Sequence, residues 1–85
     1  MRYTYYTHGT CSTQIDLEVD ESGVIRDVQF TGGCHGNLQG ISALVRGMSA
    51  SEVIHKFQGI RCGYKNTSCP DQLATALSEI IGQGQ

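Results

Sequence analysis

The chain has 85 residues and a formal net charge of −2, and its six Lys and Arg residues are dispersed. This length supports one domain with a single small core. The scattered basic residues argue against nucleic acid, because phosphate binding requires clustered Lys and Arg. Since no apolar run approaches the roughly 20 residues that span a bilayer and the N-terminus lacks a secretory signal, we expect a cytoplasmic protein that binds no membrane.

Residues 1–33 carry the pattern of β-strands. The expected strands are residues 2–7, 15–19 and 24–31. Apolar and acidic residues alternate from residue 15, as in a half-buried strand, and residues 20–23 have turn chemistry. In the third segment, Val24, Val28 and Phe30 share one face with Arg26. These segments predict a three-stranded antiparallel meander with one face left for helices.

Helical spacing replaces strand alternation after Cys34. Apolar residues of the first expected helix are Leu38, Ile41, Leu44 and Val45. Gly47 is placed to end it. Ser49 and Glu52 have the spacing of a capping box, which predicts a short second helix ending near Gly59.

A third helix is expected after a loop over residues 59–68. Pro70 suits its first turn, which puts Cys69 at or near the N-cap. Its expected buried stripe is Leu73, Ala76, Leu77, Ile80 and Ile81, followed by a frayed tail over residues 82–85. Strands over residues 1–33 followed by helices over 34–81 predict a single α+β domain spanning residues 1–85, with about three helices packed on one sheet face.

The four cysteines are the strongest functional signal. They are Cys11, Cys34, Cys62 and Cys69. Each lies beside glycines or turn residues, where thiols bind metals or exchange electrons, rather than inside an apolar pattern. In the expected fold, Cys11, Cys34 and Cys69 follow strand ends or start helices and could converge at one end of the molecule. A helix N-terminus also favours the thiolate that metal ligation requires.

Four thiolates at one point would select Zn²⁺ or an iron–sulfur cluster. The spacing lacks the compact pair of a zinc ribbon, so several alternatives stay open. Two cysteines could be buried small hydrophobes, or the even count could form disulfides. His35 and His8 are reserve ligands, whereas His55 fits the second helix as an ordinary residue. The glycine-rich segment over residues 32–37 could also cradle a phosphate, although it lacks the Lys of a P-loop.

A family resemblance adds to this interpretation. Residues 67–71 read Thr-Ser-Cys-Pro-Asp, the motif that names the TSCPD domain, and residues 30–37 also resemble that family. The domain occurs alone and at the C-terminal end of vitamin B12-dependent (class II) ribonucleotide reductases. The chain is also distantly similar to U-type iron–sulfur cluster scaffold proteins, in which cysteines follow the first and third strands and head the last helix. Cys11, Cys34 and Cys69 match those places, whereas Ser12 and Ser68 replace residues of the scaffold pattern, and Cys62 is additional.

The resemblance implies an accessory domain for ribonucleotide reduction and deoxynucleotide supply. We expect a monomer or small homo-oligomer that is not an enzyme by itself, whose partner is a ribonucleotide reductase or another redox enzyme. One alternative is a thiol–disulfide module in which Cys62 and Cys69 form a dithiol that passes electrons to a reductase. Another is a nucleotide-binding regulatory module that uses residues 32–37.

Overall fold

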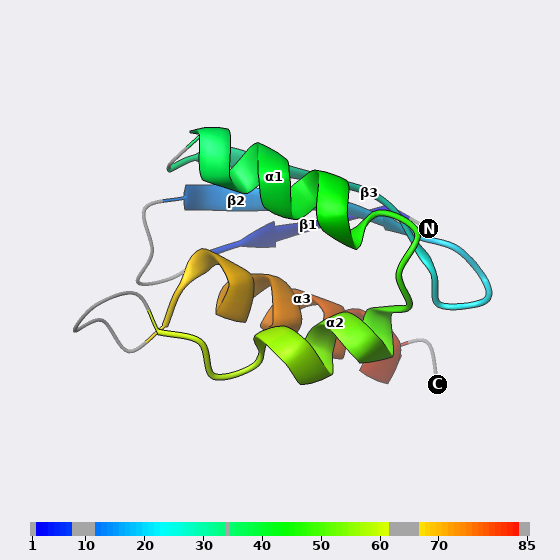
Figure 1. The fold of residues 1–85 in the computed structure, drawn as a ribbon. Helices are drawn as coiled ribbons and strands as arrows, with labels where there is room; N and C mark the ends of the chain where they lie inside the picture. Colours follow the sequence, from blue (N-terminus) through cyan, green and yellow to red (C-terminus); the bar gives the residue numbers. More distant parts are fainter. Residues whose placement is uncertain (1, 8–11, 34, 62–66, 84–85) are drawn as a thin grey trace.

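Alternating apolar residues fold the N-terminal part of the chain into an antiparallel sheet. The computed structural model describes residues 2–7, 12–33, 35–61 and 67–83 (Figure 1). Its strands are β1 (Arg2–Tyr6), β2 (Ser12–Val19) and β3 (Ile25–Gly32), in the spatial order β1-β2-β3. The helices α1 (His35–Val45), α2 (Ala50–Phe57) and α3 (Cys69–Gln83) follow. The predicted meander and the α+β class are therefore confirmed.

One irregularity in β3 corrects the predicted strand face. Glu18 lies opposite Asp27, whereas the next residue of β2, Val19, lies opposite Ile25, so Arg26 is an extra residue in β3. A bulge of this kind shifts the side-chain alternation by one position. Ile25 and Val28 consequently both face the core, at 0% and 1% exposure, whereas Arg26 is exposed. The expectation that Val24 and Arg26 share the face of Val28 was wrong for this reason.

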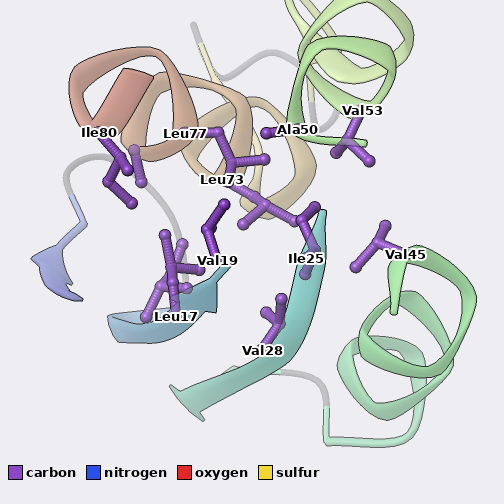
Figure 2. Close-up of a cluster of buried hydrophobic side chains, with 12 residues drawn as sticks. Leu17, Val19, Ile25, Val28, Val45, Ala50, Val53, Leu73, Leu77 and Ile80 are labelled. Carbon is purple, nitrogen blue, oxygen red and sulfur yellow. The ribbon is translucent and has the colours of Figure 1, made fainter. Parts of the chain in front are cut away.

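The core lies between one face of the sheet and the helices (Figure 2). Its buried members are Ile15, Leu17, Val19, Ile25, Val28, Val45, Ala50, Val53, Leu73, Ala76, Leu77 and Ile80. In Figure 2 the side chains of β2 and β3 point toward α3, and Val45 of α1 closes the side next to Ile25. Burying these side chains supplies the main driving force for folding, at about 1.5–3 kcal/mol for a fully buried Leu, Ile or Val.

The helix boundaries agree with the predicted stop and start signals. Gly47 follows α1 with φ +91°, a conformation that glycine adopts without strain. The Ser49 hydroxyl accepts the backbone N–H of Glu52 at 3.2 Å and so caps α2. On α1, Leu44 is 68% exposed although it follows the apolar helical spacing, and the polar Ser42 is buried.

The last helix is longer than predicted. It runs to Gln83, so residues 82 and 83, expected in the frayed tail, belong to α3. Ile80 is buried and Ile81 packs against the core, so apolar contacts hold the chain in helical conformation close to its end. The remaining two tail residues lie outside the described part of the chain.

Candidate functional site

Ser68 caps the N-terminus of α3 and ties it to the loop that precedes it. Its carbonyl accepts the N–H of Gln72 at 2.8 Å, and its hydroxyl accepts the N–H of Asp71 at 3.1 Å. Both contacts are those of an N-cap residue, which satisfies donors that have no partner inside the helix. The same hydroxyl donates to the carbonyl of Ile60 at 2.6 Å. One side chain therefore caps the helix and ties down the chain eight residues earlier.

Asp71 makes a second tie between the same two segments. Its Oδ1 accepts the backbone N–H of Gly59 at 2.8 Å, and its Oδ2 accepts the hydroxyl of Thr67. A carboxylate in the first turn also interacts favourably with the positive end of the helix dipole. Gln72 donates to the Thr67 hydroxyl at 3.1 Å and extends the network. The chain on either side of residues 62–66 is thus joined at the head of α3.

Cys69 is the first residue of α3 and lies at the centre of this region. Its side chain is buried, with the residue 8% exposed, and its Sγ lies 3.1 Å from the Oγ of Ser12. Ser12 is 2% exposed and comes from the start of β2, 57 positions earlier in the sequence. The expectation that Cys69 lies at or near the N-cap is confirmed, because Ser68 is the cap and Cys69 follows it.

Ser12 reaches Cys69 because β2 contains a bulge. Ser12 pairs with Gly32 and Gln14 pairs with Thr31, which leaves Thr13 as an extra residue. Strict alternation from the buried Ile15 would direct residue 12 away from the core, but the extra residue brings it to the core face. Sequence reasoning did not select Ser12 as a functional residue, because a single polar residue at the start of a strand carries no signal for a bulge.

Gly33 fits closely between β2 and α1. A Cβ atom at this position would lie 2.9 Å from Leu38 Cδ1 and 3.2 Å from the backbone nitrogen of Ser12, and its φ is +79°. Both the conformation and the close approach require glycine. Gly33 therefore brings the chain next to Cys34 against the same end of β2 that holds Ser12.

Three of the four predicted metal ligands lie outside the described residues. These are Cys11, Cys34 and Cys62, together with the reserve ligand His8 and the side chain of His35. Within the described ranges, no group of three or more His, Cys, Asp and Glu residues could hold a metal ion. His55 is exposed on α2, as expected for an ordinary helix residue. The four-cysteine site stays a prediction, with Cys69 as its described member.

Tyr5 of β1 lies beside the middle of α3 and lines a shallow pocket together with Ala76 and Glu79. Burial raises the pKa of its phenol above the ordinary value of 10.0, and the negative charges of Glu79 and Asp71 raise it further. Burial and these two carboxylates thus both favour the protonated form of the Tyr5 phenol. No helix formed by the described residues is both long and apolar enough to cross a bilayer.

Comparison with known proteins identifies a family but no individual relative. The family model described as the TSCPD domain matches residues 1–81, which is nearly the whole chain. Searches of curated proteins and of solved structures find no match. The Thr-Ser-Cys-Pro-Asp motif at the head of α3 lies within the matched residues.

Proposed function

Because the chain belongs to the TSCPD domain family, which is linked to ribonucleotide reductases, we propose that it is a metal-binding accessory domain for ribonucleotide reduction. Four thiolates would hold one Zn²⁺ ion or, as the second candidate, an iron–sulfur cluster. The ligands are Cys11, Cys34, Cys62 and Cys69. The cytoplasm keeps thiols reduced, so that they stay available as metal ligands. We therefore propose that the protein is cytoplasmic.

The contact between Ser12 and Cys69 supports this proposal most strongly. Ser12, the chain neighbour of Cys11, lies 3.1 Å from the Cys69 sulfur, measured from its hydroxyl oxygen. Gly33, the chain neighbour of Cys34, approaches the backbone of Ser12. Cys11 and Cys34 are each one residue, or about 3.8 Å of chain, away from Ser12 and Gly33 respectively. This short separation supports the proposal that both cysteines are ligands of the same site as Cys69.

The ties at the head of α3 support the proposal that Cys62 is a ligand. Ile60, two residues before Cys62, accepts a hydrogen bond from Ser68, which directly precedes Cys69. Two residues of chain span at most about 7 Å. The sequence from Ile60 to Cys62 therefore starts beside the helix end where the Cys69 sulfur lies, and the donor set suits a soft metal ion.

A zinc ion held by four thiolates would be structural. Such a site fills all four tetrahedral positions and leaves none for a substrate, so the domain would support a partner rather than catalyse a reaction. Bound metal would also add folding free energy to a chain with a small core. We propose a ribonucleotide reductase or another redox enzyme as the partner, on the basis of the family assignment.

Metal content tests the proposal directly. The protein should be purified anaerobically and its metal and sulfide measured, together with its visible spectrum. We expect one equivalent of colourless zinc, which is lost or weakened when any one of the four cysteines is changed to serine. Ser49→Ala, which alters only the cap of α2, is the control and should retain zinc. Circular dichroism should establish that each variant is folded.

Two other results would redirect the assignment. Brown protein with equal iron and sulfide would replace zinc by a cluster. Metal-free protein with four reactive thiols would refute metal binding and would favour the dithiol module of Cys62 and Cys69 instead. The partner is tested separately by adding the chain to a class II reductase that lacks its own C-terminal domain. Co-elution on gel filtration or a change in turnover would support the proposed partner. The absence of both effects would refute it.

A further inference from the structure

We propose that Ser12 is a positioning residue of the metal site, whose hydroxyl donates a hydrogen bond to the Cys69 sulfur and thereby strengthens metal binding. The inference rests on the proposed metal-binding function and adds to it a residue that is not itself a ligand. It starts from a single contact, the 3.1 Å separation between Ser12 Oγ and Cys69 Sγ.

The direction of this hydrogen bond follows from the chemistry of ligation. Without metal, either the hydroxyl or the thiol could donate. A cysteine that binds zinc has lost its proton, so its sulfur can only accept. The Ser12 hydroxyl must then be the donor, and a hydrogen bond to an ionised acceptor is roughly twice as strong as a neutral one.

Burial makes the contact more effective. Ser12 is 2% exposed and Cys69 is 8% exposed, so little water competes for the sulfur. In such surroundings an electrostatic interaction is stronger than it is in water. A hydroxyl also carries no formal charge, so it can stabilise the thiolate without repelling a cation.

The backbone holds Ser12 in place independently of any metal. The Thr7 hydroxyl donates to the Ser12 carbonyl, and the Thr7 N–H donates to the Thr13 carbonyl at 3.2 Å. Gly33 packs closely against the backbone of Ser12. The bulge at Thr13 directs the side chain to the core face, and bulges commonly re-aim a side chain beside a functional site. The donor is therefore oriented before the metal binds, as expected of a group that orients a ligand.

The test compares three serine variants of the full chain. Ser12→Ala removes the hydroxyl, Ser12→Thr retains it, and Ser42→Ala removes a buried hydroxyl from α1 as the control. Zinc affinity is measured by competition with a chromophoric chelator. The sulfur-to-metal charge-transfer band is recorded after substitution with Co²⁺, and the unfolding of the metal-free proteins is followed in urea.

We expect Ser12→Ala to bind zinc about tenfold or more weakly and to shift the charge-transfer band, since groups that orient ligands commonly contribute 10–100-fold to affinity. Ser12→Thr should restore both properties, and Ser42→Ala should leave both unchanged. A merely structural role would lower the stability of metal-free Ser12→Ala but leave the Co²⁺ spectrum unaltered, and that result would overturn the inference.

The outcomes separate the inference from the proposed function. Failure of the wild-type protein to bind zinc, cobalt or an iron–sulfur cluster would refute both proposals. Tight binding by the wild type, with equal affinity and spectrum in Ser12→Ala, would overturn the role of Ser12 and leave the metal site intact. Should Ser12→Ala fail to fold, Ser12→Gly also lacks the hydroxyl and suits a bulged backbone, and its affinity and spectrum decide the question in the same way.

Discussion

Replacing Gly33 by alanine would place a methyl group where the end of β2 already lies. The new Cβ would be 2.9 Å from Leu38 Cδ1 and 3.2 Å from the backbone nitrogen of Ser12. The leucine side chain can move, but the backbone of a paired strand cannot move cheaply. The φ of +79° adds about 1–2 kcal/mol for a residue with a Cβ, and overpacking adds about 1–3 kcal/mol. We therefore expect Gly33→Ala to lower the free energy of unfolding by about 2–5 kcal/mol.

Gly23→Ala provides a matched control for this prediction. Gly23 has nearly the same φ, +81°, but a Cβ there would have no atom within 4 Å. It should therefore show only the conformational cost. Urea unfolding of the metal-free proteins should find Gly33→Ala less stable than Gly23→Ala by about 1–3 kcal/mol, and each kcal/mol should lower the melting temperature by about 4–8 °C. Equal stability of the two variants would refute the close approach of Gly33 to β2.

Three further predictions concern the core, the start of α3 and the turn between β2 and β3. Leu77→Ala should lower the free energy of unfolding by about 2–5 kcal/mol. Leu44→Ala should change it by less than about 0.5 kcal/mol because Leu44 is exposed. Comparable losses for the two variants in urea unfolding would contradict the burial of Leu77 and the exposure of Leu44. Ser68→Ala removes a cap, worth about 1 kcal/mol, and also a tie to the preceding loop, so it should destabilise more than Ser49→Ala does. Asp20→Asn should lose stability at neutral pH and converge with the wild type in acid, as followed by urea unfolding across pH.

The sign of the Asp20 effect follows from its pKa. The N–H of Val24 donates to the carboxylate and, with a smaller contribution from Arg26, holds the pKa of Asp20 below its ordinary value of 3.8. The ionised form is therefore favoured in the folded state. Its contribution is present above the unfolded pKa and is lost as pH falls through the lower folded pKa. A difference between Asp20→Asn and wild type that persisted unchanged at low pH would refute this assignment.

Local sequence patterns determine the order and class of the elements but not the details of the sheet. Alternation along β2 and the cap and stop residues of the helices were sufficient for the meander and the helix starts. The bulges at Thr13 and Arg26 had no local signal, because whether an extra residue is accommodated depends on the register of two strands. Leu44 follows the helical spacing of the apolar residues of α1, but the packing of α1 along β3 leaves Leu44 exposed and buries Ser42.

The candidate site was predictable only in part, for a related reason. The environment of Cys69 at a helix start could be inferred from Pro70 and the motif around it. The approach of Ser12 could not, since it requires both the Thr13 bulge and the close packing of Gly33. Contacts between residues 57 positions apart depend on the whole fold, whereas helix starts depend on a few neighbouring residues.

The contacts of residues 67–71 bear on how the family motif should be used to sort proteins. Thr67, Ser68 and Asp71 hydrogen-bond to the helix start or to the preceding loop, and Pro70 stands in the first turn without an N–H to satisfy. Four of the five motif residues therefore stabilise the start of α3 and its connection to the preceding loop. A search with this motif selects chains that form the same helix start, irrespective of the reaction or partner that they serve. Functional subgroups within the family should therefore be distinguished by positions outside the motif, beginning with residue 12.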